Sequence, residues 1–208
     1  GADFIVKRFK KPNIIQSISY SFFKNSKAKR AFLYATIFRD RGIDTPHEIA
    51  FIEIYQNGLL ADSYFISEEC NNPSVMDTIS SDFDKELIKE LASFIVNLHE
   101  KKIVHGDLNL SNILFKKVEG KPTQFTLIDT NRSIIDANST EKRCLNNLVR
   151  ITHNRDILSY FILQYVTLKG WDYKKSINFV CSQLDKFEQK RALKRKLKSI
   201  IYTAKNKE

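Results

Sequence analysis

The first third of the chain combines two hydrophobic patterns. Residues 4–9 form a short apolar run that predicts a β-strand ending in a basic segment, and residues 49–55 and 61–67 repeat the strand pattern. These last two runs flank Gln56-Asn57-Gly58, a strong signal for a tight hairpin. Across residues 26–41, apolar side chains instead recur at steps of three and four, which is the period of a helix. We therefore expect three strands and one helix before residue 70.

Beyond residue 80 the pattern is mainly helical. Ser81 or Asp82 can cap an amphipathic helix that runs to about Lys101. Residues 113–115 and 125–128 predict a second hairpin, and after it the apolar spacing is helical to the end of the chain. The apolar face of the first helix comprises Phe83, Leu87, Leu91, Phe94, Ile95 and Leu98.

The last predicted helix contains a basic amphipathic stretch over residues 186–198. Seven lysine and arginine residues accompany an apolar stripe of Leu184, Phe187, Leu193, Leu197 and Ile200. The stripe can pack on the rest of the protein with its lysines in solvent, or it can lie on an anionic lipid surface. The sequence leaves both interpretations open.

Length and composition indicate a globular protein. The 208 residues suit one domain or a small lobe joined to a larger one, and 42% of them are hydrophobic. No apolar run reaches the ~18 residues of a membrane span, and lysines and arginines follow the first apolar residues where a signal peptide would be cleaved. Cys70, Cys144 and Cys181 fit neither a zinc spacing nor a disulfide framework, so we expect reduced thiols. The net charge of +10 suits nucleic acid, anionic lipid, a phosphorylated substrate or a merely solvated surface.

The most informative polar residues lie beside the second hairpin. Asp107 is followed five positions later by Asn112, and Asp129 ends the apolar run over residues 125–128. Phosphoryl transfer from Mg-ATP requires this arrangement, because Asp107 can accept the proton of an acceptor hydroxyl while Asn112 and Asp129 ligate Mg²⁺. Turns and helix caps would have to produce three residue types in one order and spacing, so we prefer the catalytic interpretation.

The string from His105 to Phe115, with Asp129, resembles the catalytic loop and metal-binding strand of the protein-kinase-like superfamily, with Gly106 where most protein kinases have arginine. The resemblance implies an α+β, two-lobed fold. Residues 1–70 would be a partial N-lobe, truncated because the first strands and the glycine-rich loop are absent from this chain, and residues 71–208 a mostly helical C-lobe.

The same resemblance implies an ATP site. Lys7 would hold the α- and β-phosphates, with Lys10 as second choice, and Glu68, Glu69 and Cys70 would occupy the hinge that presents backbone groups to adenine. His105 would be a structural hydrogen-bonding residue of the loop.

Two features depart from the kinase pattern. The helix over residues 26–41 has no glutamate for the strand lysine, since Ala31 and Leu33 stand where it is expected, and another carboxylate would have to substitute. Asp129-Thr130-Asn131 replaces Asp-Phe-Gly, which argues against a flipping activation segment.

Asp156 could brace the catalytic loop or simply cap a helix.

Several motifs within residues 4–150 together resemble the bacterial lipopolysaccharide core kinases, the Kdo/heptose kinase group with its WaaP- and InaA-like members. That family implies ATP and Mg²⁺ as cofactors, and a sugar hydroxyl of the lipopolysaccharide core, or another anionic sugar, as acceptor. It also implies a cytoplasmic protein with peripheral contact to the inner membrane through basic residues. The motifs are residues 6–10, 26–30, 41–46 and 105–114, Leu127-Ile128-Asp129 with Arg132, and Arg143, Leu145, Asn147 and Leu148.

Three other functions compete with this interpretation. A different phosphotransferase on the same fold would be a small-molecule kinase of antibiotic or sugar type, or an atypical protein kinase of the RIO or tRNA-modification-complex type. A pseudokinase that binds partners or lipid is favoured by the missing loop and glutamate, and disfavoured by the three intact acid-site residues. An RNA-binding module rests on charge alone, and without a nucleic-acid signature the sequence argues against nucleic acid as a partner.

Overall fold

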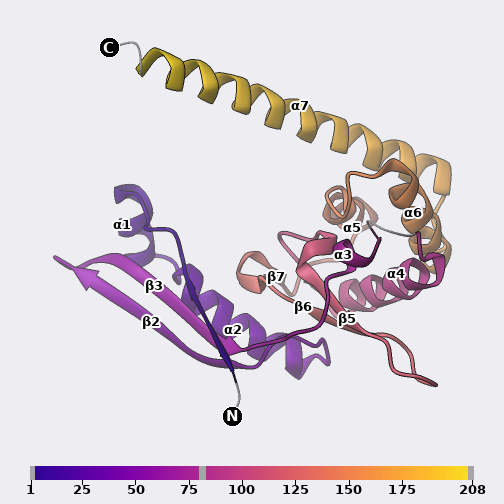
Figure 1. The fold of residues 1–208 in the computed structure, drawn as a ribbon, viewed down its shortest axis with the longest axis horizontal. Coiled ribbons are helices and arrows are strands. Elements are labelled where there is room, and N and C mark those ends of the chain that lie inside the picture. The colour runs from indigo at the N-terminus through magenta and orange to yellow at the C-terminus, as the bar shows by residue number, and fades with distance from the viewer. Residues whose placement is uncertain (1–2, 80–82, 206–208) are drawn as a thin grey trace.

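An antiparallel sheet of three strands forms one side of the molecule (Figure 1). In this computed structural model, residues 3–79 and 83–205 are described, with side chains through residue 199. The strands are β1 (Phe4–Arg8), β2 (Glu48–Gln56) and β3 (Leu59–Glu68), in the order β1-β3-β2. Asn57 and Gly58 both have positive φ, +50° and +75°, as the tight hairpin between β2 and β3 requires. The predicted strands and hairpin are confirmed.

Helix α2 (Lys27–Asp40) covers the sheet and is the predicted first helix. Ser26 caps it, because its side chain accepts the backbone N–H of Lys29 at 3.0 Å. Gly42, with φ of +65°, ends it in the left-handed conformation that glycine adopts without strain. Its buried face carries three alanines as well as a phenylalanine, so neighbouring backbone can approach this helix closely.

Helix α1 (Ile14–Phe22), which the sequence analysis left unassigned, packs on the sheet with its polar side. The Ser17 hydroxyl donates to the carbonyl of Leu60, and the Ser21 hydroxyl accepts the Leu60 N–H at 2.9 Å. Asn13 and Gln16 form a reciprocal capping box at its start. The isoleucines and Phe22 of α1 therefore face solvent, the reverse of an ordinary amphipathic helix.

The other side of the molecule is mainly helical around one apolar core. Helix α4 (Lys85–Glu100) lies in its centre and packs on α6 (Arg155–Lys169). The remaining elements are α3 (Val75–Ile79), β4 (Ile103–Val104), the short 3₁₀ helices η1 (Leu110–Asn112) and η2 (Thr130–Arg132), β5 (Ile113–Lys116), β6 (Gln124–Leu127), β7 (Ile134–Ile135), α5 (Glu141–Leu148) and α7 (Tyr173–Lys205). The β5–β6 hairpin and the helices after it confirm the predicted order.

Two predicted details of α4 are wrong. The helix is capped by Asp84, which accepts the Leu87 N–H at 2.9 Å, and Ser81 and Asp82 lie outside the described residues. Phe83 precedes the helix and meets the ring of Tyr160 edge-on, with centroids 5.5 Å apart, instead of sharing the buried apolar face.

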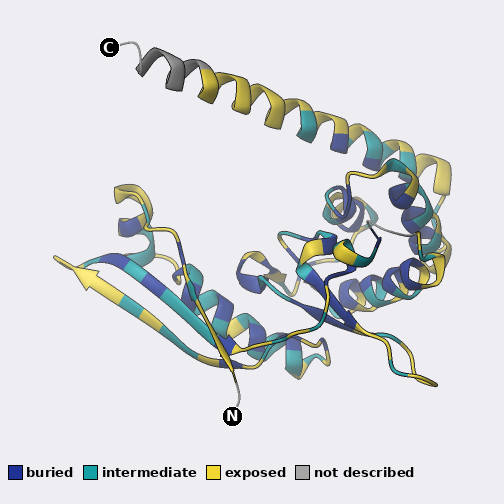
Figure 2. Cartoon of the chain, in the orientation of Figure 1, coloured by how far each residue is buried: buried dark blue, intermediate teal, exposed yellow. Residues whose placement is uncertain are grey.

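Helix α7 packs on the core only through its first half. Leu184 is buried and Phe187 is partly buried, whereas Leu193 and Leu197 are exposed; the side chain of Ile200 is among those not described. Figure 2 shows the same change from blue to yellow along the helix. The apolar stripe therefore combines a packed part and an exposed part. No helix among residues 3–79 and 83–205 is long and apolar enough to cross a bilayer.

Hydrogen bonds join the sheet to the helical side. The Asp44 carbonyl accepts the N–H of Leu127 at 2.9 Å, and the Thr126 hydroxyl donates to the Asp44 carboxylate. Nearby, the Arg41 guanidinium donates to the carbonyl of Lys101 at 2.8 Å. The Asp44 contacts hold β6 against the segment between α2 and β2, and the Arg41 contact joins the end of α2 to the end of α4. The chain crosses between the two sides after β3, and we propose the lobe boundary there, near residue 70.

Candidate active site

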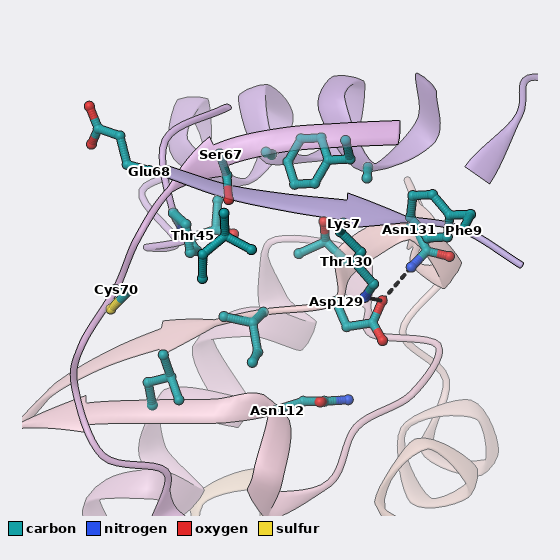
Figure 3. A pocket seen from close by; sticks show the side chains of 17 residues that line it. Lys7, Phe9, Thr45, Ser67, Glu68, Cys70, Asn112, Asp129, Thr130 and Asn131 are labelled. Atoms are coloured by element: carbon teal, nitrogen blue, oxygen red, sulfur yellow. Dashed lines mark hydrogen bonds and ion pairs between the residues drawn. The ribbon is translucent and has the colours of Figure 1, made fainter. Parts of the chain in front are cut away.

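A cavity of about 230 Å³ lies between the sheet and the β5–β6 hairpin (Figure 3). Lys7, Asp129 and Asn131 meet at one end, and Glu68 and Cys70 lie toward the other. The cavity thus gathers five of the seven site residues that the sequence predicted: Lys7, Glu68, Cys70, Asn112 and Asp129.

Two predicted residues do not line this cavity. The N–H of Glu69 donates to the carbonyl of Asp3 at 2.9 Å, which ties Glu69 to the start of β1. Asp107 lies beyond the Asn112 end of the cavity, on the loop between β4 and η1. Lys10, the second choice for the phosphate lysine, is exposed after β1 and is also not part of the lining.

The Asp129 carboxylate contacts a lysine ammonium and an asparagine amide. Its Oδ1 lies 2.8 Å from the ammonium of Lys7, and the Asn131 amide donates to the same oxygen. The backbone of Asp129 is left-handed, with φ of 62° and ψ of 43°, a conformation that aspartate tolerates better than most residues. This bend turns the chain from β6 into η2 and directs the carboxylate at Lys7.

Asn112 is fixed by its amide nitrogen and its backbone. Its Nδ2 donates to the carbonyl of Asp107 at 2.9 Å, while its own carbonyl accepts the N–H of Ile128 at 3.0 Å. Because the nitrogen is committed to Asp107, the amide oxygen is the atom that Asn112 can offer to a cation in the cavity. The same hydrogen bond connects the cavity directly to Asp107.

The residues present fit a magnesium ion. Asp129 and Asn112 offer hard oxygen ligands, and a cationic group, the Lys7 ammonium, already lies on the Asp129 carboxylate. Mg²⁺ is commonly held by one or two such side chains, with phosphates and waters completing the octahedron. No group of three or more His, Cys, Asp or Glu side chains that could hold a metal occurs among the described residues, so the nucleotide would have to supply the other ligands.

Asp107 is enclosed by two arginines. The Arg150 guanidinium donates to Oδ1 at 2.6 Å, and a guanidinium nitrogen of Arg132 lies 3.4 Å from Oδ2. The aspartate side chain is only 16% exposed. Arg132 belongs to the motif that follows Asp129 but had no predicted role, and Arg150, 43 residues beyond Asp107, gives no local signal in the sequence.

Buried polar residues brace the loop that carries Asp107. His105 donates from Nε2 to the carbonyl of Ile128 at 3.0 Å, and its Nδ1 lies 3.3 Å from the N–H of Asp107. Burial lowers the pKa of His105, so the ring is neutral and its two nitrogens can play these different parts. The hydrogen-bonding role expected of His105 is what these contacts provide.

The brace continues to the helices through Asn147 of α5. Its Nδ2 donates to the His105 carbonyl at 2.6 Å, and its Oδ1 accepts from His99, which also contacts the Tyr165 hydroxyl at 2.7 Å. Burial lowers the pKa of His99 to about 4. Asp156, the predicted candidate for this brace, lies exposed in the first turn of α6, so Asn147 takes the bracing role instead.

A steric restriction explains why residue 106 is glycine. A Cβ at this position would lie 2.0 Å from the carbonyl oxygen of Arg132, closer than any side chain allows. The loop of Asp107 and the turn that follows Asp129 therefore touch backbone to backbone. An arginine, as in most protein kinases, has no room here.

The missing helix glutamate leaves the strand lysine with another partner. Ala31 lines the cavity at a position where the glutamate was expected, and Lys7 pairs with Asp129. Glu48 does not replace it, because its carboxylate is bound by Arg39 and Thr36. Burial opposes ionisation of Glu48, but hydrogen bonds from these two residues hold its pKa below the ordinary value.

Comparison with known proteins shows which family the sequence matches. The sequence model of the lipopolysaccharide kinase (Kdo/WaaP) family matches residues 6–163. A 3-deoxy-D-manno-octulosonic acid kinase of Vibrio cholerae is 25% identical over 142 residues, covering 66% of this chain and 57% of the Vibrio protein. The probable serine/threonine-protein kinase fhkE of Dictyostelium discoideum is 26% identical over 131 residues, covering 59% of this chain and 18% of that protein. The chain thus spans less than two thirds of either relative.

Solved structures show the same fold. The structure of WaaP in complex with acyl carrier protein matches with a TM-score of 0.59 at 14% identity, covering 91% of this chain and 80% of WaaP. A crystal structure of WbdD matches with a TM-score of 0.51 at 16% identity, covering 89% of this chain and 42% of WbdD. The predicted protein-kinase-like fold is confirmed.

Proposed function

Because this chain belongs to the lipopolysaccharide kinase (Kdo/WaaP) family, we propose that it transfers the γ-phosphate of ATP to a sugar hydroxyl of the lipopolysaccharide inner core, on Kdo or heptose. One observation carries the proposal. Lys7, Asn112 and Asp129 face one cavity, and the hydrogen bond from Asn112 places Asp107 immediately beyond it. A phosphate donor and a hydroxyl acceptor need such adjoining positions.

On the donor side, Asn112 and Asp129 would hold Mg²⁺ and Lys7 would bind the phosphates. When bound there, Mg²⁺ would supply positive charge that neutralises the phosphates. Lys7 would leave the Asp129 carboxylate as nucleotide enters, since the ammonium and a metal compete for that carboxylate. At the far end of the cavity, the backbone beside Glu68 and Cys70 would contact adenine.

On the acceptor side, Asp107 would orient the sugar hydroxyl and accept its proton. Such a general base contributes on the order of 10²–10⁴ to the rate. The contacts of His105 and Asn112 with the Asp107 backbone support this role, because they hold the loop in one position before substrate arrives. The acceptor of this family implies action at the cytoplasmic face of the inner membrane, with basic residues near the lipid surface.

Two other functions have support of their own. The likeness to the Dictyostelium protein favours a protein kinase, and the pairing of Lys7 with Asp129 instead of a helix glutamate favours a pseudokinase. The complete set of Asp107, Asn112 and Asp129 is the reason to prefer catalysis, because a scaffold has no need of all three.

A panel of acceptors tests the proposal. The purified protein is given ATP labelled at the γ-phosphate, Mg²⁺, and one of three acceptors: inner-core lipopolysaccharide stripped of its core phosphates, an aminoglycoside, or casein. We expect label on lipopolysaccharide only, and none after EDTA. Label on casein or the aminoglycoside would replace the proposed acceptor, and nucleotide binding without transfer to any acceptor would indicate a pseudokinase.

A further inference from the structure

We propose that Arg132 and Arg150 form a binding site for an acid group on the acceptor, a carboxylate or a phosphate, beside the reacting hydroxyl. The inference deepens the proposed function and rests on it. The two arginines come from different segments, since Arg132 ends η2 and Arg150 follows α5, and they converge on Asp107 from both sides.

The arginines are open to an incoming ligand although Asp107 is not. Their side chains are 57% and 41% exposed, against 16% for the aspartate. Arg150 is the firmer of the two, because its guanidinium lies 2.6 Å from Asp107 and over the ring of Phe187, 4.8 Å from the centroid. Arg132 is looser, with its closest approach at 3.4 Å.

Charge and access both favour an acidic acceptor. Two guanidinium groups surround one carboxylate, so the cluster carries an excess positive charge that one further anion would balance. Both oxygens of Asp107 are covered, and a hydroxyl must reach one of them. A neutral sugar would have to displace an arginine and offer nothing in return. An acidic sugar gives Arg132 a new partner, and this would uncover the Asp107 oxygen that the hydroxyl needs.

The nucleotide is the other possible source of phosphate for these arginines. The donor cavity is lined by Lys7, Asn112 and Asp129, whereas neither Arg132 nor Arg150 is among its lining residues. The arginines lie on the Asp107 side, where the proposed acceptor enters. We therefore assign the pair to the acceptor, and the experiment separates the two sources.

The test compares one acceptor in two charge states. Dephosphorylated inner-core lipopolysaccharide is used with its sugar carboxylates free or converted to methyl esters, and KM is measured for acceptor and for ATP. For the wild type we expect kcat/KM to be at least about tenfold higher on the free acid, the effect of a hydrogen bond between charged groups. In each of the single variants Arg132→Gln and Arg150→Gln, the ratio of kcat/KM on the free acid to kcat/KM on the ester should fall to about one. The KM for ATP should stay unchanged. Arg150→Lys should keep part of this preference, and Arg191→Gln on the exposed part of α7 should keep all of it.

The outcomes separate this inference from the function beneath it. A merely structural role of the arginines would lower transfer to both acceptors equally and leave the preference intact, which would overturn the inference. A rise in KM for ATP alone would assign the arginines to the nucleotide. Equal use of acid and ester by the wild type would overturn the acid site while the kinase stands, and no transfer to either acceptor would remove both.

A second proposal is based on a separate observation, the exposed apolar face of helix α1. Ile14, Ile15 and Phe22 are 71%, 75% and 67% exposed, and with Ile18 they lie on one face of the helix. Lys10, Lys11 and Lys24 are exposed beside its two ends. The sequence holds nine lysine and arginine residues and no acidic residue between Asp3 and Asp40.

We infer that α1 docks on an anionic lipid surface. Its serines form the hydrogen bonds to the sheet, so the apolar face of α1 is not needed for packing. A helix with apolar side chains flanked by lysines is suited to the boundary between lipid headgroups and acyl chains. A protein partner would also cover apolar side chains, but the exposed lysines at both ends of the helix match anionic headgroups.

Co-sedimentation with vesicles tests this surface. We expect the protein to bind vesicles of phosphatidylethanolamine and phosphatidylglycerol, and to bind phosphatidylcholine vesicles weakly. Ile15→Ser with Phe22→Ser should weaken binding at least about tenfold, because two large apolar side chains no longer enter the lipid. Leu163→Ser with Leu168→Ser, two leucines that are also exposed, on α6, should not. Equal binding by the two double variants, with folding verified by circular dichroism, would overturn the role of α1, as would a wild type that binds no vesicle.

Discussion

The two aspartates of the candidate site are held in different ways. Asp129 contacts Lys7, which the sequence predicted as a site residue, and Asn131, its near neighbour in the chain. Asp107 contacts Arg132 and Arg150, which come from later segments. Under the proposed function a metal would take the place of Lys7 at Asp129, whereas the two arginines at Asp107 disfavour a further cation there. The difference supports the proposal that Asp129 serves the phosphate donor and Asp107 the acceptor.

Neutralising each aspartate in turn is the strongest way to separate the two roles. Asp107→Asn and Asp129→Asn should each lower kcat by on the order of 10²–10⁴. Only Asp129→Asn should also lose binding of Mg-ATP, because it removes the carboxylate that would hold the metal. Calorimetry of nucleotide binding beside the transfer assay measures both effects. Equal loss of nucleotide binding in the two variants would erase the proposed distinction.

Acid should weaken the Asp107 side of the site selectively. His99 braces that loop through Asn147, and burial holds its pKa at about 4, below the ordinary 6.5. The unfolded chain therefore binds the proton more readily, so the stability contributed by neutral His99 is complete above pH 6.5 and is lost as the pH falls toward 4. The loss should reach about 3 kcal/mol. Urea unfolding at several pH values measures it.

A variant of an exposed histidine is the control for this pH dependence. His47→Gln should leave the slope of stability against pH unchanged, since His47 lies on the surface. His99→Gln should reduce the slope, and part of the slope that remains belongs to His105, whose pKa is also lowered by burial. A slope in His99→Gln equal to that of the wild type would mean that the His99 brace is not the origin of the acid sensitivity.

Gly106 is where the two sides touch, so Gly106→Ala should disturb both. The new Cβ would lie 2.0 Å from the carbonyl oxygen of Arg132, and the loops must separate. We expect transfer to fall about 10²-fold, the usual effect of displacing a catalytic group by an ångström. Thermal unfolding should show a loss of about 1–3 kcal/mol. Gly120→Ala, with open space around its Cβ but φ of +70°, should lose stability without losing the transfer rate of the folded protein.

The smallest effect is expected at Asn131. Asn131→Ala removes the amide that donates to Asp129 but leaves Lys7 in place, so binding of Mg-ATP should weaken about tenfold. Asn146→Ala, exposed on α5, is the matched control. Titration with Mg-ATP measures the change. Unaltered binding in Asn131→Ala would mean that Lys7 alone positions Asp129.

The sequence was most informative where chemistry or periodicity is local. Alternating residues and Asn57-Gly58 predicted β2 and β3, and the spacing of Asp107, Asn112 and Asp129 predicted residues that the fold brings together. The contacts that could not be predicted are between distant segments. Arg150 is one of 34 lysines and arginines, and nothing in its neighbourhood distinguishes it before the chain folds. Helix α1 was missed although Ile14, Ile18 and Phe22 recur at helical spacing, and the sequence pattern could not show that this apolar face is exposed.

The replacement of Asp156 by Asn147 as the loop brace shows the same limit. Both are polar residues near a helix end, and only the packing of α5 against the loop decides between them. Likewise, the absent glutamate of α2 was evident in the sequence, but the pairing of Lys7 with Asp129 required the geometry.

The most direct test of the account follows labelled γ-phosphate from ATP to inner-core lipopolysaccharide stripped of its core phosphates. The wild type, Asp107→Asn and the surface variant Arg191→Gln are compared with folding verified for each. We expect transfer by the wild type and by Arg191→Gln, and a loss of on the order of 10²–10⁴ in Asp107→Asn. Transfer that persists undiminished in Asp107→Asn would contradict the central role of this aspartate, and no transfer by the folded wild type would contradict the proposed acceptor.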